Sequence, residues 1–127
     1  MLAIIGGTGL YELPGLDIVE RIAGDTPFGR ASGDVLRGRL HQQDVLFLAR
    51  HGAGHRLLPH EVNYRANVFA LKRAGATMLL GFSAVGSLAL DVSPGALAER
   101  VAFIRHCCLL DFDAARVRIS QRNMTAA

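Results

Sequence analysis

The stretch Ala3-Ile4-Ile5-Gly6-Gly7-Thr8-Gly9-Leu10 decides the fold, because an apolar run ends there abruptly in three glycines around one threonine. The pattern predicts a buried strand that runs into a loop. Gly6, Gly7 and Gly9 can take positive φ at little cost and leave their N–H groups unshielded, so the backbone can approach a ligand closely. Thr8 adds the one side-chain hydroxyl of the loop. Such a loop favours an anion, most often phosphate; the alternative is a plain glycine turn at the edge of the core.

Two known phosphate-binding signatures do not match this loop in full. The dinucleotide fingerprint requires glycine at positions 7, 9 and 12, but position 12 is Glu12, whose size and charge are wrong beside a pyrophosphate. The P-loop is absent as well, because no Gly-Lys-Ser/Thr follows. The interpretation as a dinucleotide-binding oxidoreductase therefore depends on Gly7 and Gly9 alone, and Glu12 argues against it.

Length and composition indicate one compact α/β domain. The chain has 127 residues, of which 50% are hydrophobic and 14 are glycine, values that argue against disorder. A formal net charge of +3 suits a small anionic ligand and is too weak to indicate nucleic acid. Apolar stretches are too short to span a membrane, and Met1 leads into a strand without a basic signal segment. Cys107 and Cys108 are adjacent and match no disulfide or metal spacing, so we expect a cytoplasmic protein.

Hydrophobic periodicity predicts several strands and one helix. Strands are expected at residues 2–5, 18–22, 35–40, 45–48 and 77–80, with turns at 25–29 and 41–44. A helix is expected to begin near residues 59–61 and to end in Lys72 and Arg73 before a Gly75 cap. Its apolar face contains Val62, Ala66, Phe69 and Ala70 and is widened by Tyr64, Val68 and Leu71, which predicts burial on more than one side. The strand–helix–strand succession implies parallel pairing through a right-handed crossover.

Three of these strands end in polar loops marked by glycine. The loops carry Thr8, then Arg50 and His51, then Ser83 and Ala84. Ligands of open α/β sheets bind beyond the carboxyl ends of the strands, so we expect these groups to converge. Two hydroxyls, an imidazole, backbone N–H groups and a bidentate guanidinium match a tetrahedral oxyanion. The alternative for each side chain is a structural role, as a solvated arginine or a packed histidine.

Three further side chains lie near this predicted site. His51 and His55 have the spacing of metal ligands on a helix, but the two glycines between them disfavour a helix, and no metal is expected. Asn63 and Tyr64 open the predicted helix toward the same region, where they contact a ligand or only cap and pack.

Six motifs in sequence order together carry a family resemblance. They are Gly-Gly-Thr-Gly-Leu (6–10), Thr-Pro-Phe-Gly (26–29), Leu-Ala-Arg-His-Gly (48–52), Val-Asn-Tyr-Arg-Ala-Asn (62–67), Ala-Leu-Lys (70–72) and Ser-Ala-Val-Gly-Ser (83–87). Over residues 2–95 the chain resembles the methylthioadenosine phosphorylase branch of the trimeric purine nucleoside phosphorylases, which includes bacterial methylthioinosine phosphorylases. The resemblance implies an α/β fold with a mixed sheet and flanking helices.

The resemblance also implies a pentosyltransferase activity, the phosphorolysis of a purine (methylthio)nucleoside to free purine and sugar 1-phosphate. The implied phosphate-binding residues are Thr8, Arg50, His51, Ser83 and Ala84, with Gly6, Gly7 and Gly9 supporting the loop and His55, Asn63 and Tyr64 on the substrate side. Inorganic phosphate is then a co-substrate, and no metal or organic cofactor is expected. Full-length members form homotrimers; no nucleic-acid or membrane partner is implied.

The resemblance ends after residue 95, so residues 96–127 are interpreted as a non-matching tail from a frameshifted or truncated gene; the alternative is a natural short paralogue. The family's second half supplies the purine-binding loop and the group that protonates the base, and neither has a counterpart here, so no catalytic acid is assigned. We therefore expect the incomplete, N-terminal half of the family fold, weakly active or inactive, with strand edges and an apolar sheet face uncovered. The alternative is a non-catalytic phosphate- or nucleotide-binding remnant.

Overall fold

A computed structural model of the chain describes residues 1–84, 97–101 and 116–120. The chain divides into two compact units, Met1–Val85 and Gly86–Ala127. The end of the last motif, the expected boundary at residue 95 and the two cysteines lie outside the described residues.

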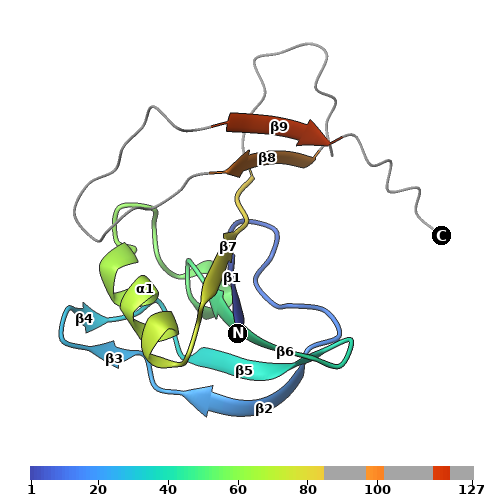
Figure 1. Ribbon diagram of the computed structural model, residues 1–127. Coiled ribbons are helices and arrows are strands. Elements are labelled where there is room, and N and C mark those ends of the chain that lie inside the picture. Colours follow the sequence, from blue (N-terminus) through green and yellow to red (C-terminus); the bar gives the residue numbers. More distant parts are fainter. Residues whose placement is uncertain (85–96, 102–115, 121–127) are drawn as a thin grey trace. The chain divides into compact units, whose positions relative to one another are not determined.

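The first unit is built on a five-stranded mixed sheet with the strand order β2-β5-β6-β1-β7 (Figure 1). Its strands are β1 (Leu2–Gly6), β2 (Asp17–Ile22), β5 (Val35–Leu40), β6 (Gln43–Ala49) and β7 (Met78–Gly81). Strand β1 is parallel to both of its neighbours, β6 and β7, whereas β5 is antiparallel to β2 and β6. A two-stranded ribbon of β3 (Asp25–Thr26) and β4 (Gly29–Arg30), the 3₁₀ turn η1 (Ala53–His55) and the helix α1 (Tyr64–Arg73) complete the unit. The predicted α/β mixed sheet is confirmed.

The hairpin of β5 and β6 is confirmed, with a shorter turn than predicted. Its two central residues, His41 and Gln42, have φ of 46° and 66°. Positive φ at both central positions gives the turn a twist that matches the strands. Strand β6 therefore begins at Gln43, two residues before the predicted start.

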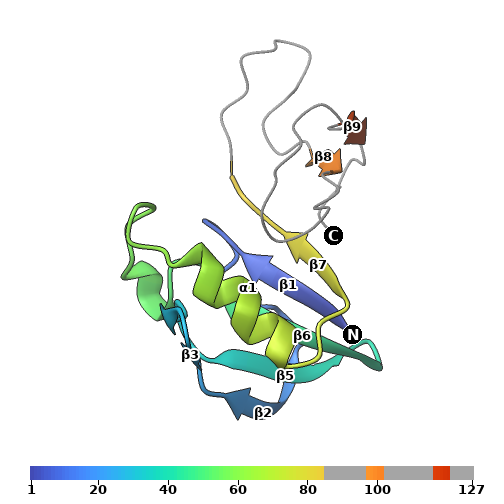
Figure 2. The same cartoon turned by 60° about the vertical axis from the view of Figure 1, so that its left-hand side comes forward.

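Alternation along β6 divides the sheet into two faces. Leu46 and Leu48 pack with Ala66, Ala70 and Leu71, so α1 covers that face of the sheet, as Figure 2 shows. Phe47 lies on the opposite face and is also buried. Its ring lies against Gly6, in the strand next to its own.

The helix begins later than predicted, at Tyr64. The Glu61 carboxylate accepts from the Leu58 N–H at 2.8 Å, and Glu61 N–H donates to the Leu58 carbonyl, so a closed turn precedes the helix. The Asn63 side chain then caps it by accepting from the Ala66 N–H at 3.1 Å.

The predicted glycine at the end of α1 is confirmed. Gly75 has φ +98° and donates to the Lys72 carbonyl, while Ala76 donates to the Leu71 carbonyl. These two hydrogen bonds form a Schellman motif, which turns the chain directly into β7.

Two predictions of burial were wrong. Tyr64 and Val68 are exposed, at 54% and 45%, because α1 packs on the sheet with one face only within the described residues. The last strand was predicted to be buried, yet Met78 is 67% exposed and Leu79 and Leu80 are exposed as well. Strand β7 is the edge of the described sheet and pairs with β1 alone there.

The described residues of the second unit form an antiparallel pair, β8 (Leu97–Val101) with β9 (Arg116–Ser120). These strands were not predicted from the sequence. Within residues 1–84, 97–101 and 116–120, no helix has the length and apolarity needed to cross a membrane.

Candidate phosphate site

The carboxyl ends of three strands meet at one edge of the sheet. The strand register sets Gly6 of β1 opposite Ala49 of β6, and Ile5 of β1 opposite Gly81 of β7. The backbone pairing continues one residue further on the β6 side, where Arg50 N–H donates to the Gly6 carbonyl at 2.8 Å. The predicted convergence of the three loops is therefore present in the fold.

The guanidinium of Arg50 lies between two of these loops. Its Nη2 donates to the Ser83 hydroxyl at 3.0 Å, and its Nε donates to Nε2 of His51 at 3.3 Å. In the part of the chain that the structure describes, Nη1 has no hydrogen-bond partner. The arginine is thus held in place from two sides and retains donors for an anion.

The glycine loop contacts the same guanidinium. A Cβ at Gly7 would lie 2.4 Å from the Phe82 carbonyl oxygen and 2.6 Å from Nη2 of Arg50. A Cβ at Gly6 would overlap the Leu10 carbonyl oxygen. Only Gly9 of the three has positive φ, at +87°. Gly6 and Gly7 are therefore required for close packing, and the predicted backbone freedom applies to Gly9.

His51 is buried behind the arginine and stacks on His55. It is 4% exposed, and its Nδ1 is 2.9 Å from the Leu57 carbonyl oxygen. The centroids of the two imidazole rings are 4.4 Å apart and the ring planes are inclined by 22°. The ring of Tyr11 lies edge-on to His55, with 5.3 Å between the ring centroids. His55 lies in a 3₁₀ turn that contains Gly54 at φ 68°, so the glycines prevent an α-helix here as expected.

The remaining predicted residues lie in the adjoining loops. Thr8 is exposed in the tight turn that Leu10 N–H closes on the Gly7 carbonyl, and Ala84 is exposed beyond the end of β7. Direct contacts thus join Arg50 with His51 and Ser83, while Thr8 and Ala84 lie at the same edge of the sheet. Phosphate binding by these five residues stays a prediction.

The predicted substrate-side residues differ in what they contact. The Asn63 side chain is occupied on both sides, since it caps α1 and donates through Nδ2 to the Phe28 carbonyl at 2.7 Å. The Tyr64 hydroxyl lies 3.4 Å from the Pro59 carbonyl oxygen. His55 stacks on His51, and Tyr11 contacts His55 edge-on, although no sequence pattern indicated Tyr11.

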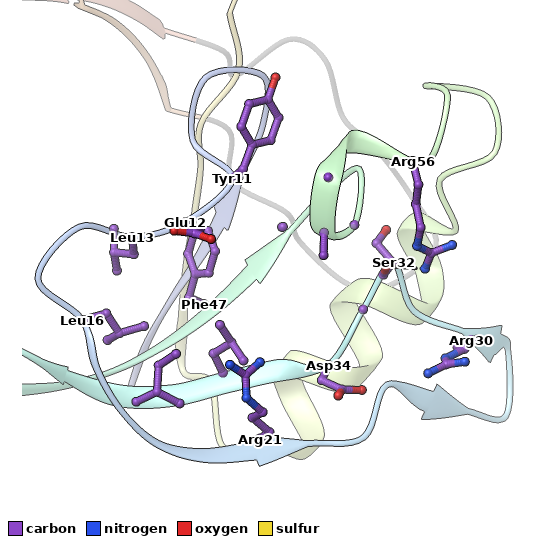
Figure 3. A pocket seen from close by; sticks show the side chains of 17 residues that line it. Tyr11, Glu12, Leu13, Leu16, Arg21, Arg30, Ser32, Asp34, Phe47 and Arg56 are labelled. Carbon is purple, nitrogen blue, oxygen red and sulfur yellow. Dashed lines mark hydrogen bonds between the residues drawn. The ribbon is translucent and has the colours of Figure 1, made fainter.

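A cavity of about 530 Å³ lies on the sheet face opposite α1 (Figure 3). Phe47 and Leu36 form part of its lining, together with Tyr11 and the arginines Arg21, Arg30 and Arg56. Arg56 donates to the Ser32 carbonyl at 2.8 Å and so has a structural role. The five predicted phosphate residues are not among the described residues that line it. The convergent strand ends, rather than this cavity, define the candidate site.

Comparison with known proteins gives the family of this chain. The sequence profile of the phosphorylase superfamily matches residues 1–117, which extends beyond the boundary expected at residue 95. The chain belongs to the phosphorylase superfamily.

Individual relatives confirm the resemblance to the methylthioadenosine and methylthioinosine phosphorylases. An S-methyl-5'-thioadenosine phosphorylase of Geobacter sulfurreducens is 46% identical over 104 residues, 82% of this chain and 36% of the relative. A probable S-methyl-5'-thioinosine phosphorylase of Pseudomonas syringae pv. tomato is 54% identical over 86 residues, 68% of this chain and 35% of the relative. The solved methylthioadenosine phosphorylase of Schistosoma mansoni in complex with tubercidin has a TM-score of 0.73 at 40% identity and covers 80% of this chain. The match covers 36% of that solved chain, so this chain spans about a third of these relatives' length.

Proposed function

We propose that this chain forms the phosphate-binding part of a purine (methylthio)nucleoside phosphorylase. The reaction is phosphorolysis: phosphate attacks C1′ of the nucleoside, the glycosidic bond to the purine breaks, and sugar 1-phosphate and free purine result. The relatives named as methylthioadenosine and methylthioinosine phosphorylases support this substrate class.

The observation that carries the proposal is the fixed guanidinium of Arg50. It lies at the carboxyl edge of the sheet, where it contacts the Ser83 hydroxyl and adjoins Gly7. Phosphate held there would be bound by the arginine, by the hydroxyls of Thr8 and Ser83, and by the backbone near Ala84. A phosphate fixed in this way acts as the nucleophile and also stabilises an oxocarbenium-like transition state electrostatically.

We do not assign to this chain the side chains that would bind the purine or protonate it. Of the proposed substrate-side residues, His55 stacks on His51, the ring that contacts Arg50. We propose that the 127-residue chain by itself is weakly active or inactive. The second candidate function is a non-catalytic phosphate- or nucleotide-binding protein, and it is supported by the same arginine.

Titration with inorganic phosphate by calorimetry tests the proposed site. We expect the unsubstituted chain to bind phosphate and Arg50→Ala to lose about 10- to 150-fold in affinity, because a charge-assisted contact is worth about 1.5–3 kcal/mol. Arg39→Ala is the matched control, since Arg39 is an exposed arginine of β5 that lies 3.5 Å from Asp44. Equal affinity of Arg50→Ala and the unsubstituted chain would overturn the proposal.

A further inference from the structure

The hydrogen-bond partners of His51 match one tautomer of its ring. A backbone carbonyl only accepts, so Nδ1 carries a proton and donates it to the Leu57 oxygen at 2.9 Å. The guanidinium Nε of Arg50 only donates, so Nε2 of His51 carries no proton and accepts at 3.3 Å. These two contacts match the imidazole tautomer that carries its proton on Nδ1, and they occupy both ring nitrogens.

The surroundings of the ring hold it in this orientation. The ring is buried, and His55 covers one side of it in a stacked arrangement. The ring of Tyr11 in turn contacts His55 edge-on. The contact of Nδ1 with the Leu57 carbonyl and the stacked ring of His55 fix the plane of the His51 ring. In this plane Nε2 is directed at Arg50.

From this geometry we propose that the ring of His51 is a positioning residue for Arg50 and does not itself donate to the bound anion. This inference rests on the proposed function and specifies how one of its residues contributes. The ring accepts from Nε, while Ser83 accepts from Nη2, so two partners hold one edge of the guanidinium and Nη1 stays available within the described residues. A guanidinium oriented in advance loses less conformational freedom when it binds an oxyanion bidentately.

The tautomer can be read directly by nitrogen-15 NMR of the imidazole rings. The chain has five histidines, and the signals of His51 are those that disappear in His51→Gln. We expect Nδ1 to carry the proton and Nε2 to be unprotonated, both in the free chain and at saturating inorganic phosphate. A proton on Nε2 in the phosphate-bound chain would overturn the proposal, because the ring would then donate to the anion.

Two substitutions test the role through affinity. His51→Gln keeps an acceptor for Arg50, and we expect an affinity for phosphate within about threefold of the unsubstituted chain. His51→Phe keeps the aromatic packing but offers no acceptor, and we expect an affinity lower by about 5- to 10-fold. Equal affinity of the Phe and Gln variants would overturn the positioning role.

The outcomes separate this inference from the proposed function. If the unsubstituted chain binds no phosphate, the proposed function fails, while the tautomer of the free chain still shows whether His51 accepts from Arg50. If His51→Phe unfolds, the positioning role is tested by the tautomer that NMR measures and by the phosphate affinity of His51→Gln. A proton on Nε2 in the free chain would overturn the inference without any reference to phosphate.

Discussion

Arg50 donates to the hydroxyl of Ser83 at 3.0 Å, although 33 positions separate them in sequence and strand β1 lies between the strands that precede them. The guanidinium therefore reaches across the end of β1, over the glycine loop. This contact is possible only because Gly7 has no side chain, since a Cβ there would lie 2.6 Å from Nη2. The glycine loop and the arginine thus form one unit, and a change in either should disturb the other.

Gly7→Ala should therefore weaken phosphate binding and destabilise the fold. Its methyl group would press on the Phe82 carbonyl and on Arg50, and overpacking of this kind costs about 1–3 kcal/mol. Gly33→Ala is the control, because no atom lies within 4 Å of a Cβ built there and its φ is not positive. Thermal unfolding and phosphate calorimetry on both variants check this. Similar losses in both would show that Gly7 has no special role.

Substitution of Asn63 should separate its cap from its contact with Phe28. Asn63→Ala removes both hydrogen bonds, and loss of a helix cap alone costs about 0.5–2 kcal/mol. Asn63→Ser keeps a hydroxyl oxygen for the Ala66 N–H without placing a second acceptor against the Phe28 carbonyl, and it should retain most of the free energy of unfolding measured in urea. If Ser destabilises as much as Ala, the bond to the Phe28 carbonyl, and not the cap, is the main contribution.

The strands and the loops at their carboxyl ends could be predicted because their signals are local. Short apolar runs indicate the strands, and the glycines that follow them mark the strand ends. Both signals can be recognised without knowing what lies further along the chain. The start of α1 could not be predicted in this way, because the apolar pattern continues upstream to Val62 and does not show that Glu61 closes a turn with Leu58.

The exposure of β7 depends on pairing partners distant in sequence, and the surroundings of His51 depend on an unusual local backbone conformation. An apolar run such as Met78-Leu79-Leu80 has the same pattern in a central strand and in an edge strand, so its burial follows from pairing partners rather than from its own residues. The contact of His51 with Leu57 requires the left-handed backbone at Gly54 and His55. No short pattern in the sequence indicates a histidine in that conformation.

The exposed edge of β7 should promote association of the chain with itself. Met78 is 67% exposed on this edge strand, and unpaired apolar edges are templates for further pairing. Met78→Lys should lower the concentration-dependent association measured by light scattering and change stability by less than about 0.5 kcal/mol. Val19→Lys is the matched control on β2, the opposite edge of the described sheet, where Val19 is 70% exposed. If both variants lower association equally, β7 is not the preferred edge.

The 127-residue chain by itself should show no appreciable phosphorolysis, even if it binds phosphate at Arg50. Catalysis requires phosphate, sugar and base to be held together, and orienting the reactants can contribute about 7–11 kcal/mol, most of which is lost when only one reactant is fixed. Protonation of the departing purine contributes about 10²- to 10⁴-fold more, and we assign no residue of this chain to that step. The measurement is release of base from methylthioadenosine, methylthioinosine, adenosine or inosine by folded protein with phosphate, compared with Arg50→Ala. Turnover near that of an ordinary enzyme, abolished by Arg50→Ala, would contradict the prediction and show that this chain supplies the groups for sugar and base.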